Sequence, residues 1–295
     1  SGLSDYLAED EMDALRICRE VVSHLNWSKK GNQPLNKSLE PKYDKEELLG
    51  ILSEDLKSAV DIKEIIARFA DGSKFEEYKS LYGSSLVCGW ANVHGYQIGI
   101  LGNNGPIYPE SAEKGATFIQ LCNKRNIPLI FLQNVTGFLV GKDFERQGII
   151  KKGSQLINAV SNSTVPHITF IVGASYGAGT YAMSGKAYNN RFTFLWPTAK
   201  IAVMGPEQMA GVMSIVRQAK SKRDGKKFDK KADDQLKQMV TDYLEKLSHG
   251  LVASSMLTDD GIIDPRDTRD IIGFCLSIVN NDEIQGAEEY GVFRL

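Results

Sequence analysis

HITFIVGASYGAGTYAMSGKAY, residues 167–188, joins an apolar run to a glycine-rich turn and a segment that can form a helix. The apolar run at 167–172 predicts a strand that is buried on both of its faces. The turn at 173–179 consists mostly of small residues, and a helix can begin near Gly179. The first N–H groups of a helix have no partner inside it and favour negative charge. This stretch therefore predicts an anion-binding turn at the end of a buried strand.

The segments around this stretch alternate between apolar strands and amphipathic helices. Strands are predicted at 85–93, 96–101, 127–133, 192–196 and 201–204, and helices at 12–25, 62–69, 111–125, 149–161, 207–217 and 268–279. A turn at His94 and Gly95 joins the first two strands, and the charged segment 219–237 is typical of a solvated loop that runs into an exposed helix. The alternation predicts an α/β fold with a largely parallel sheet.

The composition is that of a folded protein without a large excess of charge. The chain has 295 residues, of which 42% are hydrophobic and 24% charged, and its formal net charge is -2. This length can bury one large core or two of moderate size. The charge balance argues against a sequence-independent nucleic-acid binder, and no apolar run is long enough to span a bilayer. Residues 1–45 are predicted to form a helical arm and linker, and residues 46–295 the main domain.

The cysteines and the start of the chain bear on its compartment. The four cysteines are Cys18, Cys88, Cys122 and Cys275. They are widely spaced and form no CxxC pair, so we expect free thiols and neither a metal site nor a disulfide framework. No signal-peptide pattern precedes Ser1, and we expect a protein that is not secreted. The absence of an initiator Met suggests a piece of a longer polypeptide.

Two enzyme motifs overlap in the glycine-rich turn. GASYG at 173–177 matches the G-x-S-x-G nucleophile elbow of serine hydrolases, but only His249 follows it as a potential base. GAGTYA at 177–182 matches the dinucleotide fingerprint, which needs an acidic residue about 20 positions further on. No Asp or Glu occurs between Glu145 and Glu207, and this argues against dinucleotide binding.

The same lack of acids supports a third interpretation of the turn. Residues 146–206 carry six Lys or Arg and no carboxylate, so the local field is expected to favour anions. Backbone amides at the helix start are suited to stabilising a developing oxyanion. A base would then have to come from elsewhere, for example from a cofactor. The plainer alternative is a tight turn whose small residues serve packing alone.

Several motifs lie in order along the chain. They are NNGPIYPESAEKG (103–115), RNIPLIFLQNVTGFLVG (125–141), GASYGAGTYAMSGKAY (173–188), RFTFLWPTAKIAVMGPEQ (191–208), DDGIIDPRDTR (259–269) and EYGVFRL (289–295). Together they resemble the carboxyl-terminal half of the biotin-dependent acyl-CoA carboxyltransferases. The resemblance covers essentially the whole chain. Ser175, Ala178 with Gly179, and Glu207 with Gln208 resemble the methylcrotonoyl or geranyl type, of which the methylcrotonoyl type is the more similar.

The resemblance implies a fold, an activity and a set of site residues. The implied fold is α/β and crotonase-like (ClpP/crotonase), a spiral of strand–strand–helix units. The implied enzyme moves a carboxyl group from carboxybiotin, carried on a partner subunit, to an acyl-CoA of the methylcrotonoyl type, as in leucine degradation. The backbone amides of Ala178 and Gly179 would form its catalytic oxyanion pair. Biotin would also contact Gly137, Phe138, Tyr176, Gly177 and Thr180.

The resemblance also implies that half of the active site lies outside this chain. In the family, an amino-terminal domain binds CoA and faces the carboxyl-terminal domain of a second subunit, and that first domain is absent here. We therefore expect a homo-oligomer in which this chain contributes the biotin side, and little activity from this chain alone. The location would be the mitochondrial matrix in a eukaryote or the cytoplasm in a bacterium. No nucleic-acid or membrane partner is expected.

The turn departs from the family at several positions, and this leaves alternatives open. Where the methylcrotonoyl pattern reads GGSYGAGNYGMCG, this chain has Ala174, Thr180, Ala182 and Ser184 in place of Gly, Asn, Gly and Cys. GLVASSMLT at 250–258 also differs from the aromatic-rich segment of the family. A non-catalytic paralogue or assembly subunit with the same fold is therefore one alternative. A serine hydrolase that uses GASYG is another.

Overall fold

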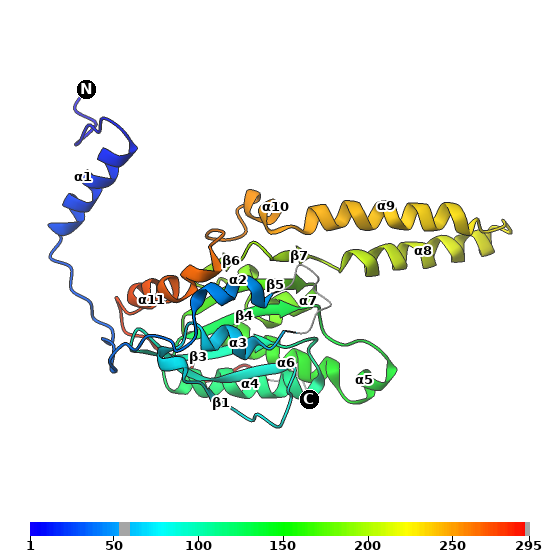
Figure 1. Ribbon diagram of the computed structural model, residues 1–295, viewed down its shortest axis with the longest axis horizontal. Helices are drawn as coiled ribbons and strands as arrows, with labels where there is room; N and C mark the ends of the chain where they lie inside the picture. Colours follow the sequence, from blue (N-terminus) through cyan, green and yellow to red (C-terminus); the bar gives the residue numbers. More distant parts are fainter. Residues whose placement is uncertain (53–59, 293–295) are drawn as a thin grey trace.

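The computed structural model describes residues 1–52 and 60–292, within which the core is a mixed sheet of seven strands (Figure 1). The strands are β1 (Glu76–Glu77), β2 (Leu86–Val93), β3 (Tyr96–Asn103), β4 (Leu129–Val135), β5 (His167–Tyr176), β6 (Phe192–Leu195) and β7 (Lys200–Ala202). Strands β1 to β6 are neighbours in sequence order, and β7 pairs with β5. The pairs β1–β2 and β2–β3 are antiparallel. The pairs β3–β4, β4–β5, β5–β6 and β5–β7 are parallel. The predicted α/β fold with a largely parallel sheet is confirmed.

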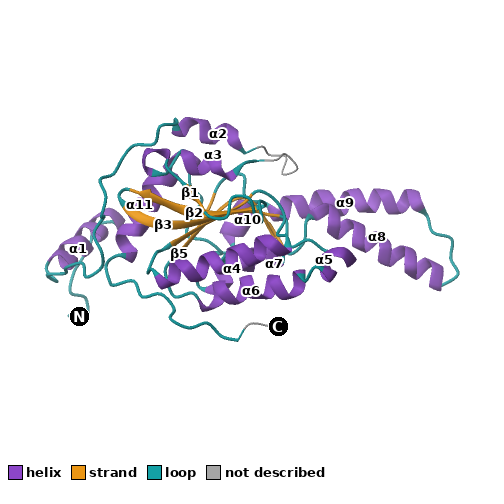
Figure 2. Cartoon of the chain, turned by 90° about the horizontal axis from the view of Figure 1, so that it is seen from below, coloured by secondary structure: helices purple, strands orange, loops and turns teal. Residues whose placement is uncertain are grey.

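Helices cover both faces of the sheet. The α-helices are α1 (Glu11–Ser23), α2 (Leu48–Ile51), α3 (Ile62–Ala67), α4 (Pro109–Lys124), α5 (Lys142–Arg146), α6 (Ile149–Asn162), α7 (Ala178–Ala182), α8 (Pro206–Arg223), α9 (Lys230–Ser248), α10 (Gly250–Ser255) and α11 (Thr268–Val279). Helices α2, α3 and α11 bury their apolar residues against one face, and α4 and α6 bury theirs against the other (Figure 2). Successive side chains of a strand point alternately into these two cores. Ile130 and Leu132 pack in the core with α3, and Leu129 and Phe131 pack in the core with α4.

Strand β5 is longer than its apolar run predicts. The run ends at Val172, but the strand continues to Tyr176 because Ala174, Ser175 and Tyr176 pair in parallel with β7. Every residue of β5 is buried. The turn that follows is therefore reduced to Gly177, and α7 begins at Ala178, one residue before the predicted start.

The charged segment 219–237 is mostly helical. Helix α8 continues to Arg223, and α9 begins at Lys230, so only a short loop separates them. The two helices form an antiparallel hairpin that extends away from the sheet (Figure 1). Buried Asp233 joins them, because it accepts a hydrogen bond from Ser214 Oγ and pairs with Arg217 at 2.8 Å.

The start of the chain forms an exposed helix and an irregular segment. Helix α1 has no buried residue and stands apart from the sheet (Figure 1). Residues 24–44 lack helix and strand, yet Lys30 N–H donates to Asn281 O and Asn36 N–H donates to Gly95 O. The division of the chain at residue 45 stays a prediction. Within residues 1–52 and 60–292, no helix is long and apolar enough to cross a membrane.

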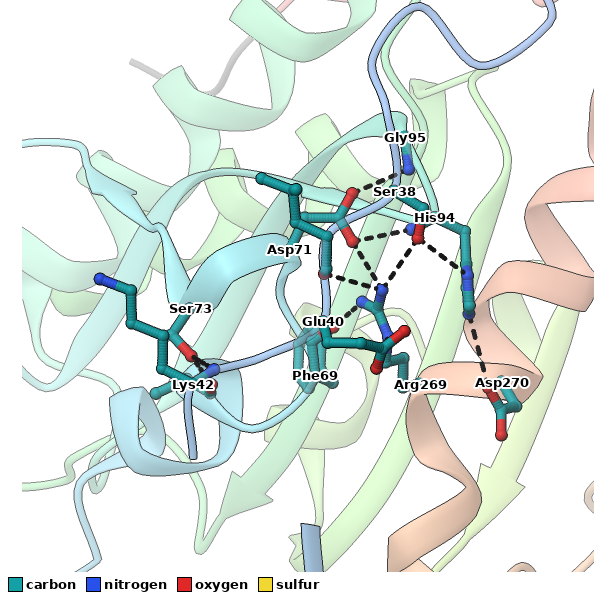
Figure 3. Close-up of polar contacts among 12 residues, drawn as sticks. Ser38, Glu40, Lys42, Phe69, Asp71, Ser73, His94, Gly95, Arg269 and Asp270 are labelled. Atoms are coloured by element: carbon teal, nitrogen blue, oxygen red, sulfur yellow. Dashed lines mark hydrogen bonds and ion pairs between the residues drawn. The ribbon is translucent and has the colours of Figure 1, made fainter. Parts of the chain in front are cut away.

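A buried ion pair fastens this irregular segment to the body (Figure 3). Arg269 of α11 pairs with Asp71 at 2.8 Å, and both side chains are less than a tenth exposed. Asp71 also accepts the N–H groups of His94 and Gly95, which form the predicted turn between β2 and β3 with positive φ angles. Arg269 donates in addition to Leu39 O at 3.0 Å. One pair thus joins α11, the hairpin turn and the irregular segment.

Candidate functional site

The turn after β5 presents two backbone N–H groups without partners. Gly177 has φ 56° and ψ -138°, a conformation that an L side chain rarely adopts, and α7 follows at once. In the described part of the chain, the N–H groups of Ala178 and Gly179 donate no hydrogen bond. Ala178 is exposed and Gly179 is buried. The turn therefore offers two unpaired donors, one of them on an exposed residue, as expected at the first turn of a helix.

Two cavities meet at Ala178. The smaller, about 270 Å³, is almost wholly apolar and lies between the loop after β4 and helix α6. Its lining includes Phe138, Ile149, Ile150, Ile157 and Ala178. The larger, about 550 Å³, lies on the other side of α7, and its lining includes Gly177, Ala178, Thr180, Tyr181, Ile201 and Met256. The unpaired amides thus lie beside two hollows that can receive apolar groups.

The loop after β4 lies against this turn. A Cβ added at Gly179 would lie only 3.2 Å from Gly137 Cα, so the two backbones are in close contact. Phe138 packs against Gly153 of α6 and lines the smaller cavity. The fold therefore brings together Gly137, Phe138 and the amides of the turn, although 40 residues of sequence separate them. Their contact with biotin stays a prediction.

Two other predicted biotin contacts present their side chains differently. Tyr176 is buried at the end of β5, and burial raises the pKa of its hydroxyl. Thr180 lines the larger cavity, but its hydroxyl faces inward and lies 2.9 Å from Ser175 Oγ. A contact from Thr180 to a ligand would therefore come from its backbone or its methyl group.

The loop after β3 also lies at this site, although none of its residues was predicted to be there. Ile107 N–H donates to Gly137 O at 3.0 Å, and Leu139 N–H donates to Ile107 O at 3.1 Å. Tyr108 stands edge-on to Phe144 of α5. NNGPIY comes directly after a predicted strand. This position could have placed the loop at the site, since the carboxyl ends of parallel strands meet at one edge of the sheet.

Ser175 is not arranged as a nucleophile. Its side chain is fully buried, and its Oγ lies 2.6 Å from Gln133 Oε1. His249, which the hydrolase interpretation requires, instead caps α10 by accepting Leu251 N–H at its Nδ1. The GASYG segment lies within β5 up to Tyr176, and no strained elbow forms at the serine. The geometry therefore does not support the hydrolase alternative.

The basic character of residues 146–206 is weaker than predicted. Lys186 pairs with Asp260 at 2.9 Å, and Lys152 pairs with Glu113 at 3.0 Å. Both acids come from outside the acid-free stretch, which sequence spacing alone does not reveal. Attraction of an anion therefore depends more on the backbone amides at the turn than on net local charge.

The family model named carboxyl transferase domain matches residues 1–291, almost the whole chain. The chain belongs to the carboxyl transferase family. Motif EYGVFRL at its end lies only partly within the described residues.

Relatives of this carboxyl transferase chain are subunits of biotin-dependent enzymes. It is 53% identical over 100% of its length to a Mycobacterium tuberculosis protein named "probable biotin-dependent acyl-coenzyme A carboxylase beta2 subunit", covering 56% of that protein. It is 44% identical to the mitochondrial methylcrotonoyl-CoA carboxylase beta chain of Dictyostelium discoideum, again over its whole length and 50% of that protein. The chain thus spans about half the length of these relatives.

A solved structure supports the same family and the predicted fold. The beta subunit of Pseudomonas aeruginosa geranyl-CoA carboxylase superposes with a TM-score of 0.86 at 42% identity. The match covers all of this carboxyl transferase chain and 56% of that subunit. The crotonase-like fold expected from the sequence motifs is confirmed.

Buried His167 begins β5 of this carboxyl transferase chain and contacts the segment that follows α7. Its ring nitrogens lie 2.8 Å from Ser184 Oγ and 2.7 Å from Ser163 Oγ. Burial lowers the pKa of His167 from 6.5 to about 4, because the charged imidazolium is poorly solvated there. The ring therefore stays neutral at physiological pH and acts as a fixed support for Ser184, the residue that follows Met183 at the end of α7.

The pKa shift of His167 predicts a loss of stability in acid. Below pH 6.5 the unfolded chain binds a proton at this residue while the folded chain does not, so stability is present above pH 6.5 and falls toward pH 4. At pH 4.5, two pH units below 6.5, we expect a loss of about 2.5 kcal/mol from this group, at up to about 1.4 kcal/mol per pH unit. Urea unfolding at pH 7 and 4.5 measures it. His167→Asn is expected to lose about 2.5 kcal/mol less than the parent between these pH values, and an equal loss would contradict the assignment.

Proposed function

We propose that this chain supplies the biotin side of a carboxyl transferase site. The reaction moves a carboxyl group from carboxybiotin, carried on a partner subunit, to an acyl-CoA. One observation supports this most strongly: the unpaired amides of Ala178 and Gly179 open beside the Gly137–Phe138 loop, where two cavities meet. Phe138 and the apolar walls suit the fused rings of biotin, and the amides suit its ureido oxygen.

The chemistry needs donors at the turn and no carboxylate. Biotin, when bound, supplies the carboxyl group and afterwards the basic ureido group that removes the proton from the acyl-CoA. Negative charge develops on an oxygen during transfer, and fixed N–H groups stabilise it without reorganising. Residues 176–182 include no Asp, Glu or His, which fits a base that the ligand itself provides.

We propose the methylcrotonoyl type of acyl-CoA as substrate, on the names of relatives at 44% and 46% identity and on Ser175 with Ala178 and Gly179. The whole protein would act as a homo-oligomer with a biotin-carrying subunit, in leucine degradation. It would lie in the mitochondrial matrix of a eukaryote or the cytoplasm of a bacterium. Exposed apolar side chains on α1 and on the α8–α9 hairpin are consistent with subunit contacts; they include Met12, Leu15, Ile215, Met239 and Tyr243.

The substrate proposal is tested with the full-length subunit assembled with its biotin-carrying partner. ATP-dependent carboxylation is measured with methylcrotonoyl-CoA, geranyl-CoA and propionyl-CoA. We expect kcat/KM for methylcrotonoyl-CoA to exceed that for propionyl-CoA by about tenfold or more, a difference within reach of apolar pocket contacts. A preference for propionyl-CoA would contradict the acyl assignment. Assembly with the partner but no carboxylation of any acyl-CoA would favour the non-catalytic alternative.

A further inference from the structure

We infer that Thr180, Ser175 and Gln133 form a hydrogen-bonded relay that positions the oxyanion turn for carboxyl transfer. The inference rests on the proposed function, and it assigns three positioning residues that do not themselves touch the transferred group. The relay joins α7 to the carboxyl-terminal parts of strands β4 and β5, next in sequence to the turn that carries the two unpaired amides.

The direction of every hydrogen bond in this relay follows from one fixed end. Met183 O is a backbone carbonyl, so it accepts from Gln133 Nε2 at 2.7 Å. This orientation of the amide turns Gln133 Oε1 toward Ser175 Oγ, which must donate to it at 2.6 Å. Ser175 has then used its only proton, so Thr180 Oγ1 donates to Ser175 Oγ at 2.9 Å. The relay is therefore a directed chain from Thr180 to Met183.

Both ends of the relay lie on the same short helix. Thr180 is in the middle of α7, and Met183 is its C-cap. Helix α7 has only five residues, and so few residues cannot hold a helical conformation by themselves. Gln133 and Ser175 are fully buried between the helix layers, where an unmade hydrogen bond is costly. The relay thus fixes both the second half of α7 and, through it, the direction of its first N–H groups.

Other contacts also hold α7. Gly179 is in close contact with Val135 and Gly137, and Met183 N–H donates to Gly179 O. The relay adds the side-chain hydrogen bonds that join the helix to β4 and β5. Loss of the relay would let the amides turn away from the ligand, which lowers kcat more than it weakens binding, since the donors act on charge that develops during transfer.

The test uses a matched pair of Thr→Val variants in the full-length subunit with its partner. Thr180→Val keeps the shape of the side chain but removes the donor. Thr268→Val removes a hydroxyl that is equally integrated, bonded to Pro265 O and Trp196 Nε1, but lies on α11 away from the site. We expect kcat to fall about tenfold in Thr180→Val with KM for the acyl-CoA within twofold, and to stay at the parent value in Thr268→Val.

Conservative variants and hydrogen exchange complete the test. Thr180→Ser retains the hydroxyl donor and is expected to keep kcat within about twofold of the parent. Thr180→Asn introduces the residue of the family pattern, whose amide is also a donor, and the same result is expected. Deuterium uptake of residues 174–185 should rise in Thr180→Val and in Ser175→Ala, and not in Thr268→Val. Unchanged uptake and unchanged kcat in Thr180→Val would overturn the relay. If the parent enzyme transfers no carboxyl group, the proposed function fails, and the uptake result still decides on the relay.

Discussion

Ala178→Pro is expected to lower carboxyl transfer by about a hundredfold in the full-length subunit. Proline removes one of the two N–H groups assigned to the ureido oxygen, and loss of one such donor costs about 3 kcal/mol of transition-state stabilisation. Ala178 is the first residue of α7, a position that proline tolerates well, and its N–H makes no hydrogen bond in the described residues. The fold should therefore survive. Steady-state rates and thermal melting are measured together.

The control for this substitution must keep the N–H group. Ala178→Ser does so at an exposed position and is expected to retain activity within a few-fold of the parent. Gly179→Val is a poorer probe, because a Cβ there would lie 2.8 Å from Val135 Cγ2 and would disturb the loop instead of the ligand. A folded Ala178→Pro enzyme that works at the parent rate would show that this amide has no part in the reaction.

Arg269→Met is expected to destabilise the protein by about 3–5 kcal/mol. The substitution leaves the buried Asp71 carboxylate without its counter-charge, and breaking a buried pair from one side is strongly unfavourable. It also removes donors from the carbonyls of Phe69 and Leu39, so the irregular segment should detach from the body. Chemical denaturation gives the loss in free energy, and proteolysis within residues 24–44 reports the detachment.

Two further variants separate the buried charge from simple loss of an arginine. Asp71→Asn with Arg269→Met removes both charges and keeps one side-chain oxygen, which can replace one of the two carboxylate oxygens that accept from His94 and Gly95. The double variant is therefore expected to be more stable than Arg269→Met alone. Arg266→Met breaks a solvent-exposed pair with Asp264 and should cost much less. If Arg269→Met and Arg266→Met have equal effects, the buried pair does not fasten the segment.

The sequence predicts those elements whose cause is local. The apolar runs at 127–133 and 167–172 each form a strand that is buried on both faces. Such a strand can be predicted locally, because its consecutive residues are all apolar. The end of β5 could not be predicted in this way. Its last three residues are held by β7, some 26 residues away in sequence, and that pairing leaves no local signal. The same limit applies to Lys186, whose partner Asp260 lies 74 residues away.

Part of the candidate site can be predicted from the sequence. Ala178, Gly179 and the Gly137–Phe138 loop follow neighbouring parallel strands, whose carboxyl ends must share one edge of the sheet. Their proximity can therefore be predicted once the strands are known. The link from Gln133 to Ser175 cannot, because it depends on a register shift within β4 and on which way two buried side chains turn. Geometry of this kind is decided by packing between segments.

The most direct measurement follows a labelled carboxyl group from a carboxylated acyl-CoA to free biotin. It uses the full-length subunit without the biotin-carrying partner, so that only the transfer site is tested. The amides of Ala178 and Gly179 are predicted to support transfer of label to biotin, and Ala178→Pro is predicted to slow it about a hundredfold while Ala178→Ser does not. Transfer that is absent from the folded parent, or equally fast in the proline variant, would contradict the assignment of the oxyanion site to this turn.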